Sequence, residues 1–291
     1  MKAVKVLTNP VQTYYKALSK FSPETLFAKY ADKCRKAGIT KPQFILSFDC
    51  DTKEDINVVW DMHQRLMDMG VQSVYAVPGE LLQKGEDVYG KILESGSEFI
   101  NHGYREHTYF DQAAGQDLSC FFYDQQPLDD LVEDISKGHQ NLKDVLGVTA
   151  QGWRTPHFGT FQKNHELRFL HKVLNDLGYK YSSSTKPYFG YRFGPLFNNY
   201  GLCEIPVSGM VSAPLAILDS WAFFMAPDRT RKEEEYLVEI NALTSAVKSQ
   251  GAGLINLYAD PLHIYDKDTF FQAIESLVQS VQPLQFKDLK V

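Results

Sequence analysis

The 291-residue sequence lacks several features that mark specialised classes of protein. Its four cysteines form no C-x-x-C pair, so neither a disulfide framework nor a cysteine-based metal motif is indicated. No apolar run reaches the roughly 18 residues that a membrane-spanning helix needs. The N-terminal stretch MKAVKVLTNPVQTYYKALSKF contains no apolar segment of signal-peptide length. We therefore expect a cytoplasmic protein with no membrane span.

An excess of positive charge is also absent. The chain has 30 Lys and Arg against 36 Asp and Glu, a formal net charge of −6. A protein that binds nucleic acid without sequence preference neutralises many phosphates, so that class is excluded. Internal repeats and low-complexity tracts are missing, and 44% apolar with 23% charged residues is usual for a globular protein. Nothing in the sequence indicates the oligomeric state.

Short apolar runs alternate with segments of helical periodicity after residue 42. This alternation predicts an α/β fold with a mainly parallel sheet. About seven strands over some 250 residues favour an irregular (β/α) barrel over two small domains. The predicted strands are residues 43–48, 71–77, 98–101, 152–154, 179–182, 202–206 and 253–258.

The first 42 residues have a different character. They are polar and aromatic, and Ser22-Pro23-Glu24-Thr25 is typical of a helix start. The segment ends in a turn-like stretch, Gly38–Pro42. We therefore expect an N-terminal helical extension over residues 1–42 and a barrel domain over 43–291.

Charged and imidazole side chains follow four of the predicted strands. In parallel α/β folds the carboxyl ends of the strands form one rim, where active sites lie. Oxygen and imidazole ligands suit a divalent ion such as zinc. The residues delivered to this rim are Asp49, Asp51, His102, His107, Arg154, His157, Asp260 and His263.

Asp49 and Asp51 are separated by one residue at the end of a strand. Side chains at positions i and i+2 of a strand share a face, so both carboxylates are expected in one site with Cys50 directed away. Two adjacent carboxylates need a cation, or one must hold a proton. We therefore expect one carboxylate to bind the metal and the other to act as the base. The alternative is a pair of aspartates that caps the next helix.

His102 and His107 stand five positions apart. On an ideal helix their side chains would diverge by about 140°, so a shared metal requires a loop or a bulged turn. Glu106, four residues after His102, is a rival ligand. Two unrelated surface histidines are the simpler alternative.

The remaining candidates have structural interpretations too. His63, His139 and His171 lie on or beside the apolar faces of predicted helices, as core histidines do, and His165 is expected to be exposed. Arg154 is placed either to hold Asp49 ionised and oriented or to form a structural salt bridge.

Five stretches, in this order, resemble the polysaccharide deacetylase (NodB-homology) family, carbohydrate esterase family four. Ser47-Phe-Asp-Cys-Asp51 is similar to the first motif in its D-x-D form, and Val74-Tyr-Ala-Val-Pro-Gly79 to the second strand. Asn101–His107 stands in place of N-H-T-x-x-H, and Arg154-Thr-Pro-His157 in place of R-x-P-Y. Leu174–Ser183 is similar to L-x-x-L-G-Y-x-Y-D-S.

The resemblance implies an irregular (β/α) barrel and a divalent ion, usually zinc, held by Asp51, His102 and His107. Asp49 would be the general base and Arg154 would orient it. The family's final L-x-H motif, which supplies the general acid, is altered here to Leu257-Tyr-Ala-Asp-Pro-Leu-His263. Asp260, His263 or His157 would then provide the acid.

The implied activity is a metal-dependent hydrolase that removes an N-acyl group, N-acetyl above all, from an amino sugar. The substrate would be a polysaccharide or, better for a cytoplasmic enzyme, its nucleotide- or lipid-linked precursor. The alternatives are a deformylase of a lipid-linked formamido sugar, a catalytically inactive carbohydrate-binding protein, and a glycosidase that uses Asp49 with a second carboxylate and no metal.

Overall fold

The computed structural model describes residues 10–226 and 231–291, so residues 1–9 of the predicted extension lie outside it. A nine-stranded sheet is the centre of the fold, in the order β10-β1-β2-β3-β6-β7-β9-β8, with β11 also paired to β1. Its strands are β1 (Pro42–Asp49), β2 (Val74–Val77), β3 (Glu98–Asn101), β6 (Gly152–Trp153), β7 (Tyr181–Ser182), β8 (Phe197–Asn199), β9 (Leu202–Glu204), β10 (Gly253–Ala259) and β11 (Gln282–Leu284).

All seven predicted strands are present, and they pair with one another in parallel. The sequence analysis missed β11, which is parallel to β1, and β8, which is antiparallel to β9. Within the described ranges β8 and β10, at the two ends of the order, do not pair. The predicted irregular barrel is therefore confirmed as a curled sheet that stays open on one side.

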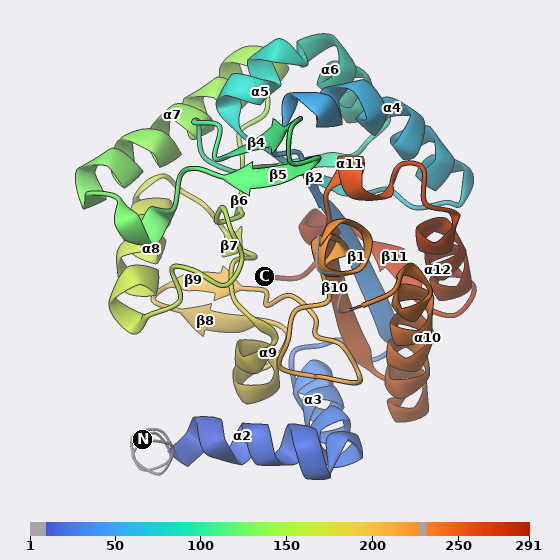
Figure 1. Ribbon diagram of the computed structural model, residues 1–291. Helices are drawn as coiled ribbons and strands as arrows, with labels where there is room; N and C mark the ends of the chain where they lie inside the picture. Colours follow the sequence, from blue (N-terminus) through green and yellow to red (C-terminus); the bar gives the residue numbers. More distant parts are fainter. Residues whose placement is uncertain (1–9, 227–230) are drawn as a thin grey trace.

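The helices surround the outside of the curled sheet (Figure 1). Central β1 is buried along most of its length, and its sequence is accordingly a nearly continuous apolar run. None of the described helices has the length and apolar character needed to cross a membrane. The helices are α2 (Pro10–Phe21), α3 (Pro23–Lys36), α4 (Lys53–Asp68), α5 (Gly79–Lys84), α6 (Glu86–Glu94), α7 (Leu128–Leu146), α8 (Asn164–Asp176), α9 (Pro187–Phe193), α10 (Glu233–Gln250), α11 (Pro261–Ile264) and α12 (Asp268–Val278).

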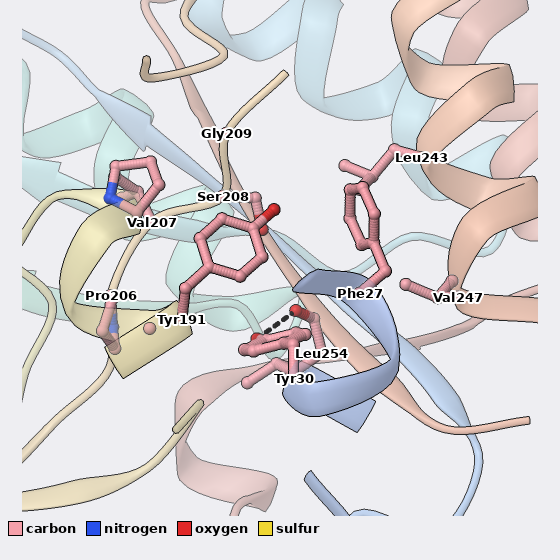
Figure 2. Close-up of a pocket in the computed structure, with 12 residues that line it drawn as sticks. Phe27, Tyr30, Tyr191, Pro206, Val207, Ser208, Gly209, Leu243, Val247 and Leu254 are labelled. Atoms are coloured by element: carbon pink, nitrogen blue, oxygen red, sulfur yellow. Dashed lines mark hydrogen bonds between the residues drawn. The ribbon is translucent and has the colours of Figure 1, made fainter. Parts of the chain in front are cut away.

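Helix α3 begins at Pro23 behind Ser22, as predicted, and packs against the barrel. Its Phe27 and Tyr30 reach a small pocket of about 20 Å³ that α9, α10 and β10 also line (Figure 2). That volume holds about one water molecule, so the pocket is a packing junction rather than a ligand site. Tyr30 donates a hydrogen bond to the Leu254 carbonyl (2.8 Å) across it. The boundary at residue 42 stays a prediction.

A hairpin that the sequence analysis did not predict crosses one end of the barrel. It consists of β4 (Thr108–Asp111) and β5 (Gln116–Ser119), with Thr108 paired to Ser119. The turn contains Gly115 at φ +64°. Because β4 starts directly after His107, the hairpin fixes that histidine at the end of the sheet where β1 and β3 also end.

The buried Glu98 carboxylate on β3 anchors the C-terminal segment. It accepts hydrogen bonds from the Lys287 amide (2.9 Å) and from the Tyr181 hydroxyl. Burial raises the pKa of Glu98 to about 7, against the opposing Lys287 amide. The folded protein therefore binds this proton more tightly than the unfolded chain does.

We expect the free energy of unfolding to depend on pH through this carboxyl. A carboxyl with a raised folded pKa contributes stability that is complete below its unfolded pKa, near 4.5, and is lost as the pH rises through 7. Relative to wild type, Glu98→Gln should therefore gain about 2–3 kcal/mol between pH 5 and pH 8. Urea unfolding of both proteins at the two pH values measures it. An equal stability difference at both pH values would contradict the assignment.

Candidate active site

The end of β1 brings both predicted aspartates to one cleft. Asp49 and Asp51 line a cavity of about 330 Å³, whereas Cys50 is fully buried in the hydrophobic core. This is the alternation that an extended strand imposes. Helix α4 is capped by Thr52 and Asp55 instead, so the aspartate pair does not serve as the cap.

Asp51, His102 and His107 form a compact cluster whose ligand atoms lie within 4.8 Å of one another. Nε2 of His102 and Nε2 of His107 are 3.2 and 3.0 Å from Asp51 Oδ1. All three atoms are buried, and none has a hydrogen-bond partner within the described part of the chain. Ligand atoms around tetrahedral zinc with bonds of 2.0–2.1 Å stand about 3.3 Å apart. The cluster therefore fits a small divalent ion.

The electrostatics of the cluster keep the Asp51 carboxylate ionised. Burial alone would raise the pKa of Asp51, but His107 and His102 hold the pKa of this carboxyl well below its usual value. His102 Nδ1 lies 2.9 Å from the Arg154 carbonyl oxygen, to which it can only donate. That bond fixes the tautomer and leaves the Nε2 lone pair directed at the cluster.

The two histidines share a site because the chain between them is a loop. Gly103 has φ +83°, and a β-carbon there would meet Asp134 Oδ2 at 2.4 Å. Asp134, on α7, accepts hydrogen bonds from the amides of Tyr104 (3.1 Å) and Arg105 (2.8 Å). Its other oxygen accepts the hydroxyl of Tyr123 (2.6 Å). Asp134 thus holds the loop that carries both ligands.

Asp134→Ala should weaken metal binding although Asp134 is not in the metal cluster. Removing a residue that holds metal ligands in place commonly lowers the metal affinity about 10–100-fold. Competition with a chromogenic chelator measures the affinity, and Tyr123→Phe, which removes one bond and keeps the carboxylate, should lose much less. Equal metal affinity in Asp134→Ala and wild type would show that the loop holds its shape without this residue.

Glu106, the rival ligand, is directed elsewhere. Its carboxylate forms an ion pair with Lys84, and its amide donates to Glu80 Oε2 (2.7 Å). Since residues 102–107 are not helical, the helical angle between the histidines does not apply. The structure therefore brings His107, and not Glu106, to Asp51 and His102.

Asp49 is held by Arg154, which is fully buried. Nη1 of Arg154 donates to Asp49 Oδ1 (2.8 Å), and Nη2 donates to Ser47 Oγ (2.8 Å). Burial raises the pKa of Asp49 above its usual value, and the Arg154 guanidinium opposes this shift. A carboxylate held in this way is both oriented and more basic than an exposed one.

Asp260 and His263 line the same cleft. Asp260 Oδ2 lies 3.0 Å from His263 Nδ1, and Ser220 Oγ is within 3.1 Å of both atoms. Burial raises the pKa of Asp260, and the Asp51 and Asp49 carboxylates raise it further against the opposing His263. The pair therefore offers a proton-holding group beside the metal cluster.

His157 also reaches the cleft, in an uncommon conformation. It has φ +56°, and its Nε2 lies 3.1 Å from the His107 carbonyl oxygen. Burial, and then His107, lower the pKa of His157 to about 4. The cleft is completed by aromatic rings with which a sugar can stack, from Phe122, Phe158, Trp221 and Tyr258.

The other histidines are structural, as expected. His63 contacts the Tyr75 hydroxyl and Ser95 Oγ, both at 2.9 Å, and His139 contacts the Tyr179 hydroxyl at 3.0 Å. Buried His171 lies 2.7 Å from the Asn199 carbonyl oxygen. The side chain of His165 is 79% exposed.

Sequence reasoning missed three residues that position the others. Ser47 could have been found, because the alternation that pairs Asp49 with Asp51 places Ser47 on the same face. Asp134 and Ser220 had no local signal, since both act on residues about 30 or more positions away in the sequence.

No family model matches the sequence, and no curated protein sequence matches it. Solved structures do match. A polysaccharide deacetylase candidate from Mycobacterium smegmatis aligns with TM-score 0.58 and 17% identity, over 85% of this chain and 89% of that one. The PuuE allantoinase aligns with TM-score 0.62 and 12% identity, over 85% and 87%. A peptidoglycan N-acetylglucosamine deacetylase aligns with TM-score 0.52 and 14% identity, over 86% and 89%.

These matches cover most of the chain at low identity, so they establish its architecture and not its activity. The matched structures also include a mutant of a carbohydrate esterase family 4 pseudoenzyme with restored activity. Together with the open barrel and the position of the Asp-His-His cluster, the matches identify the architecture. The chain has the distorted-barrel fold of the polysaccharide deacetylases of carbohydrate esterase family 4.

Proposed function

We propose that the protein is a metal-dependent hydrolase that removes an N-acyl group, N-acetyl above all, from an amino sugar. The main support for this proposal is that a metal-binding cluster and a candidate base lie at the same cleft. The Asp51-His102-His107 cluster fits a divalent ion, and the carboxylate of Asp49, held by Arg154, lines the cleft with Asp51. The deacetylase match supports the same reaction class.

Asp51, His102 and His107 would hold the ion, and we propose zinc, which takes one carboxylate and two imidazoles readily. Bound there, a divalent ion supplies the Lewis acidity that polarises an amide carbonyl and acidifies water. Asp49 would accept the proton of the attacking water, since its raised pKa makes it a better base. Arg154 would keep that carboxylate ionised and oriented.

The departing amine needs a proton, and we propose that the Asp260–His263 pair provides it. Both residues line the cleft, and the Asp260 carboxyl lies 3.0 Å from the His263 imidazole, so the pair can share one proton. His157 is the less suitable acid, because its Nε2 is occupied by the His107 carbonyl. Ser220, which contacts both members, would act as a positioning residue.

Hydrolysis of N-acetyl and N-formyl amino sugars before and after chelation tests the proposal. We expect acetate release that stops on treatment with a chelator and returns with zinc. Preference for formyl substrates would favour the deformylase alternative. Hydrolysis of glycosidic bonds that survives chelation would point to a glycosidase, and bound metal without any hydrolysis would overturn the enzymatic proposal.

An inactive carbohydrate-binding protein is a second candidate for one specific reason. Strand β10 delivers Asp260 where the resemblance leads one to expect a histidine, so the acid function depends on His263 one turn later. Sugar binding that is unaffected by His263→Ala, with no turnover in wild type, would favour this candidate.

A further inference from the structure

A second large cavity, of about 690 Å³, lies beside the cleft and is absent from the proposed mechanism. Its lining residues come from α2, from the start of α8, from α9 and from the turn between β8 and β9. Figure 1 shows α9 and α2 near the end of the sheet that β9 and β8 form.

The cavity is positively charged. Four cations line it, from Lys16, Lys163, Lys186 and Arg192, and none of the described residues that line it is acidic. Only Lys163 has an ion pair, with Glu166 at 2.7 Å, so that neighbouring carboxylate is already neutralised. The other three cations have no acidic partner in residues 10–226 and 231–291. In a chain of net charge −6, such a local excess of cations indicates an anionic ligand.

Lys186 is the cation whose position suggests a direct role. Burial lowers its pKa, and no carboxylate compensates the partly desolvated ammonium group. Its amide is held by Gln162 Oε1 (3.2 Å), and Gln162 also donates to the Ser184 carbonyl (2.8 Å). A half-buried cation whose backbone amide is held in place is a suitable contact for phosphate oxygens.

The cavity and the cleft are joined by one segment of chain. Phe158 and Thr160 line the cleft, whereas Gln162 and Lys163 line the cavity. Lys186 lies against the middle of this segment, since a β-carbon added at Gly159 would be 3.5 Å from Lys186 Cε and 3.7 Å from Nζ. Lys186 therefore lies next to the segment of chain that borders both the cleft and the cavity.

The cavity also offers aromatic surface next to its cations. Tyr188, Phe189, Phe193 and Tyr200 line it, and the Arg192 guanidinium stacks 4.5 Å from the centre of the Phe193 ring. Aromatic rings beside cations suit a carrier with both phosphate groups and a flat or apolar part, such as a nucleoside or a lipid chain.

We propose that this cavity binds the phosphate groups of an activated amino sugar, so that the substrate is a sugar phosphate or diphosphate rather than a finished polysaccharide. The inference rests on the proposed deacylase function. In a 2-acylamino sugar 1-phosphate the N-acyl group is on the carbon next to the one that bears the phosphate. The two groups would therefore lie in the neighbouring cleft and cavity, with Lys186 between them.

Calorimetric titration with inorganic pyrophosphate, UDP and decyl diphosphate tests this inference without needing turnover. We expect wild type to bind all three, and Lys186→Met and Arg192→Met each to weaken binding about tenfold, the value of one charge-assisted hydrogen bond. Lys143→Met, which removes the same charge from α7, is the matched control and should bind as wild type does. Tighter binding of UDP than of pyrophosphate would assign a nucleotide carrier, and tighter binding of decyl diphosphate a lipid carrier.

The same titration on chelator-treated protein separates the cavity from the metal cluster, because pyrophosphate also binds metal ions. Retained binding supports the cavity, and binding that disappears with the metal would overturn the inference. So would no binding in wild type, or equal weakening in Lys143→Met. Anion binding without hydrolysis would leave this inference standing and remove the proposed function, whereas hydrolysis of a neutral N-acetyl sugar without anion binding would do the reverse.

Discussion

Asp49→Asn should lower turnover by about 10²–10⁴-fold, the usual contribution of general-base catalysis. The amide oxygen can still accept the Arg154 hydrogen bond, so the geometry of the site should survive while the base is lost. The measurement is the rate of acetate release, made beside the metal content of the same preparation.

The metal content of the variant shows whether activity is lost with the base or with the metal. Asp49 is outside the Asp51-His102-His107 cluster, so the Asp49→Asn variant should hold as much metal as wild type. Near-complete activity in this variant would exclude Asp49 as the base, and loss of metal would make it a ligand instead.

Arg154→Met should lower the free energy of unfolding by about 3–5 kcal/mol, because it leaves the buried Asp49 carboxylate without its counter-ion. Arg154 is fully buried and donates hydrogen bonds to both Asp49 and Ser47. Activity should fall to the level of Asp49→Asn, since the base loses its orientation. Chemical denaturation of the two proteins measures the stability.

A double variant separates the unpaired charge from general damage to the core. Adding Asp49→Asn to Arg154→Met removes the stranded carboxylate and should recover part of the lost stability. Ser47→Ala, which removes a single hydrogen bond to the same arginine, should cost only about 1 kcal/mol. A double variant no more stable than Arg154→Met would show that packing, and not the ion pair, explains the loss.

The parts of the site that follow from strand geometry could be predicted from the sequence. The alternation at the end of β1 was enough to place Asp49 and Asp51 together and Cys50 in the core. The ends of parallel strands were enough to bring Arg154 and the two histidines to the same rim. Only local conformation and a general rule of α/β folds were needed for these predictions.

The parts that depend on distant contacts could not be predicted. The choice between His107 and Glu106 depends on Asp134, on the hairpin 108–119 and on Lys84, none of which has a motif. The environment of His263 depends on Ser220, some 40 residues earlier in the chain. The basic cavity joins residues 12–16 to residues 162–215, so no local pattern could reveal it.

The most direct test of the account is the metal content of purified wild type beside His102→Ala. His102 is fully buried, and its Nε2 is one of three unsatisfied ligand atoms in the cluster, so its loss should empty the site. The account predicts about one zinc or similar ion per wild-type chain and almost none in the variant. No metal in wild type, even after zinc is added, would contradict it.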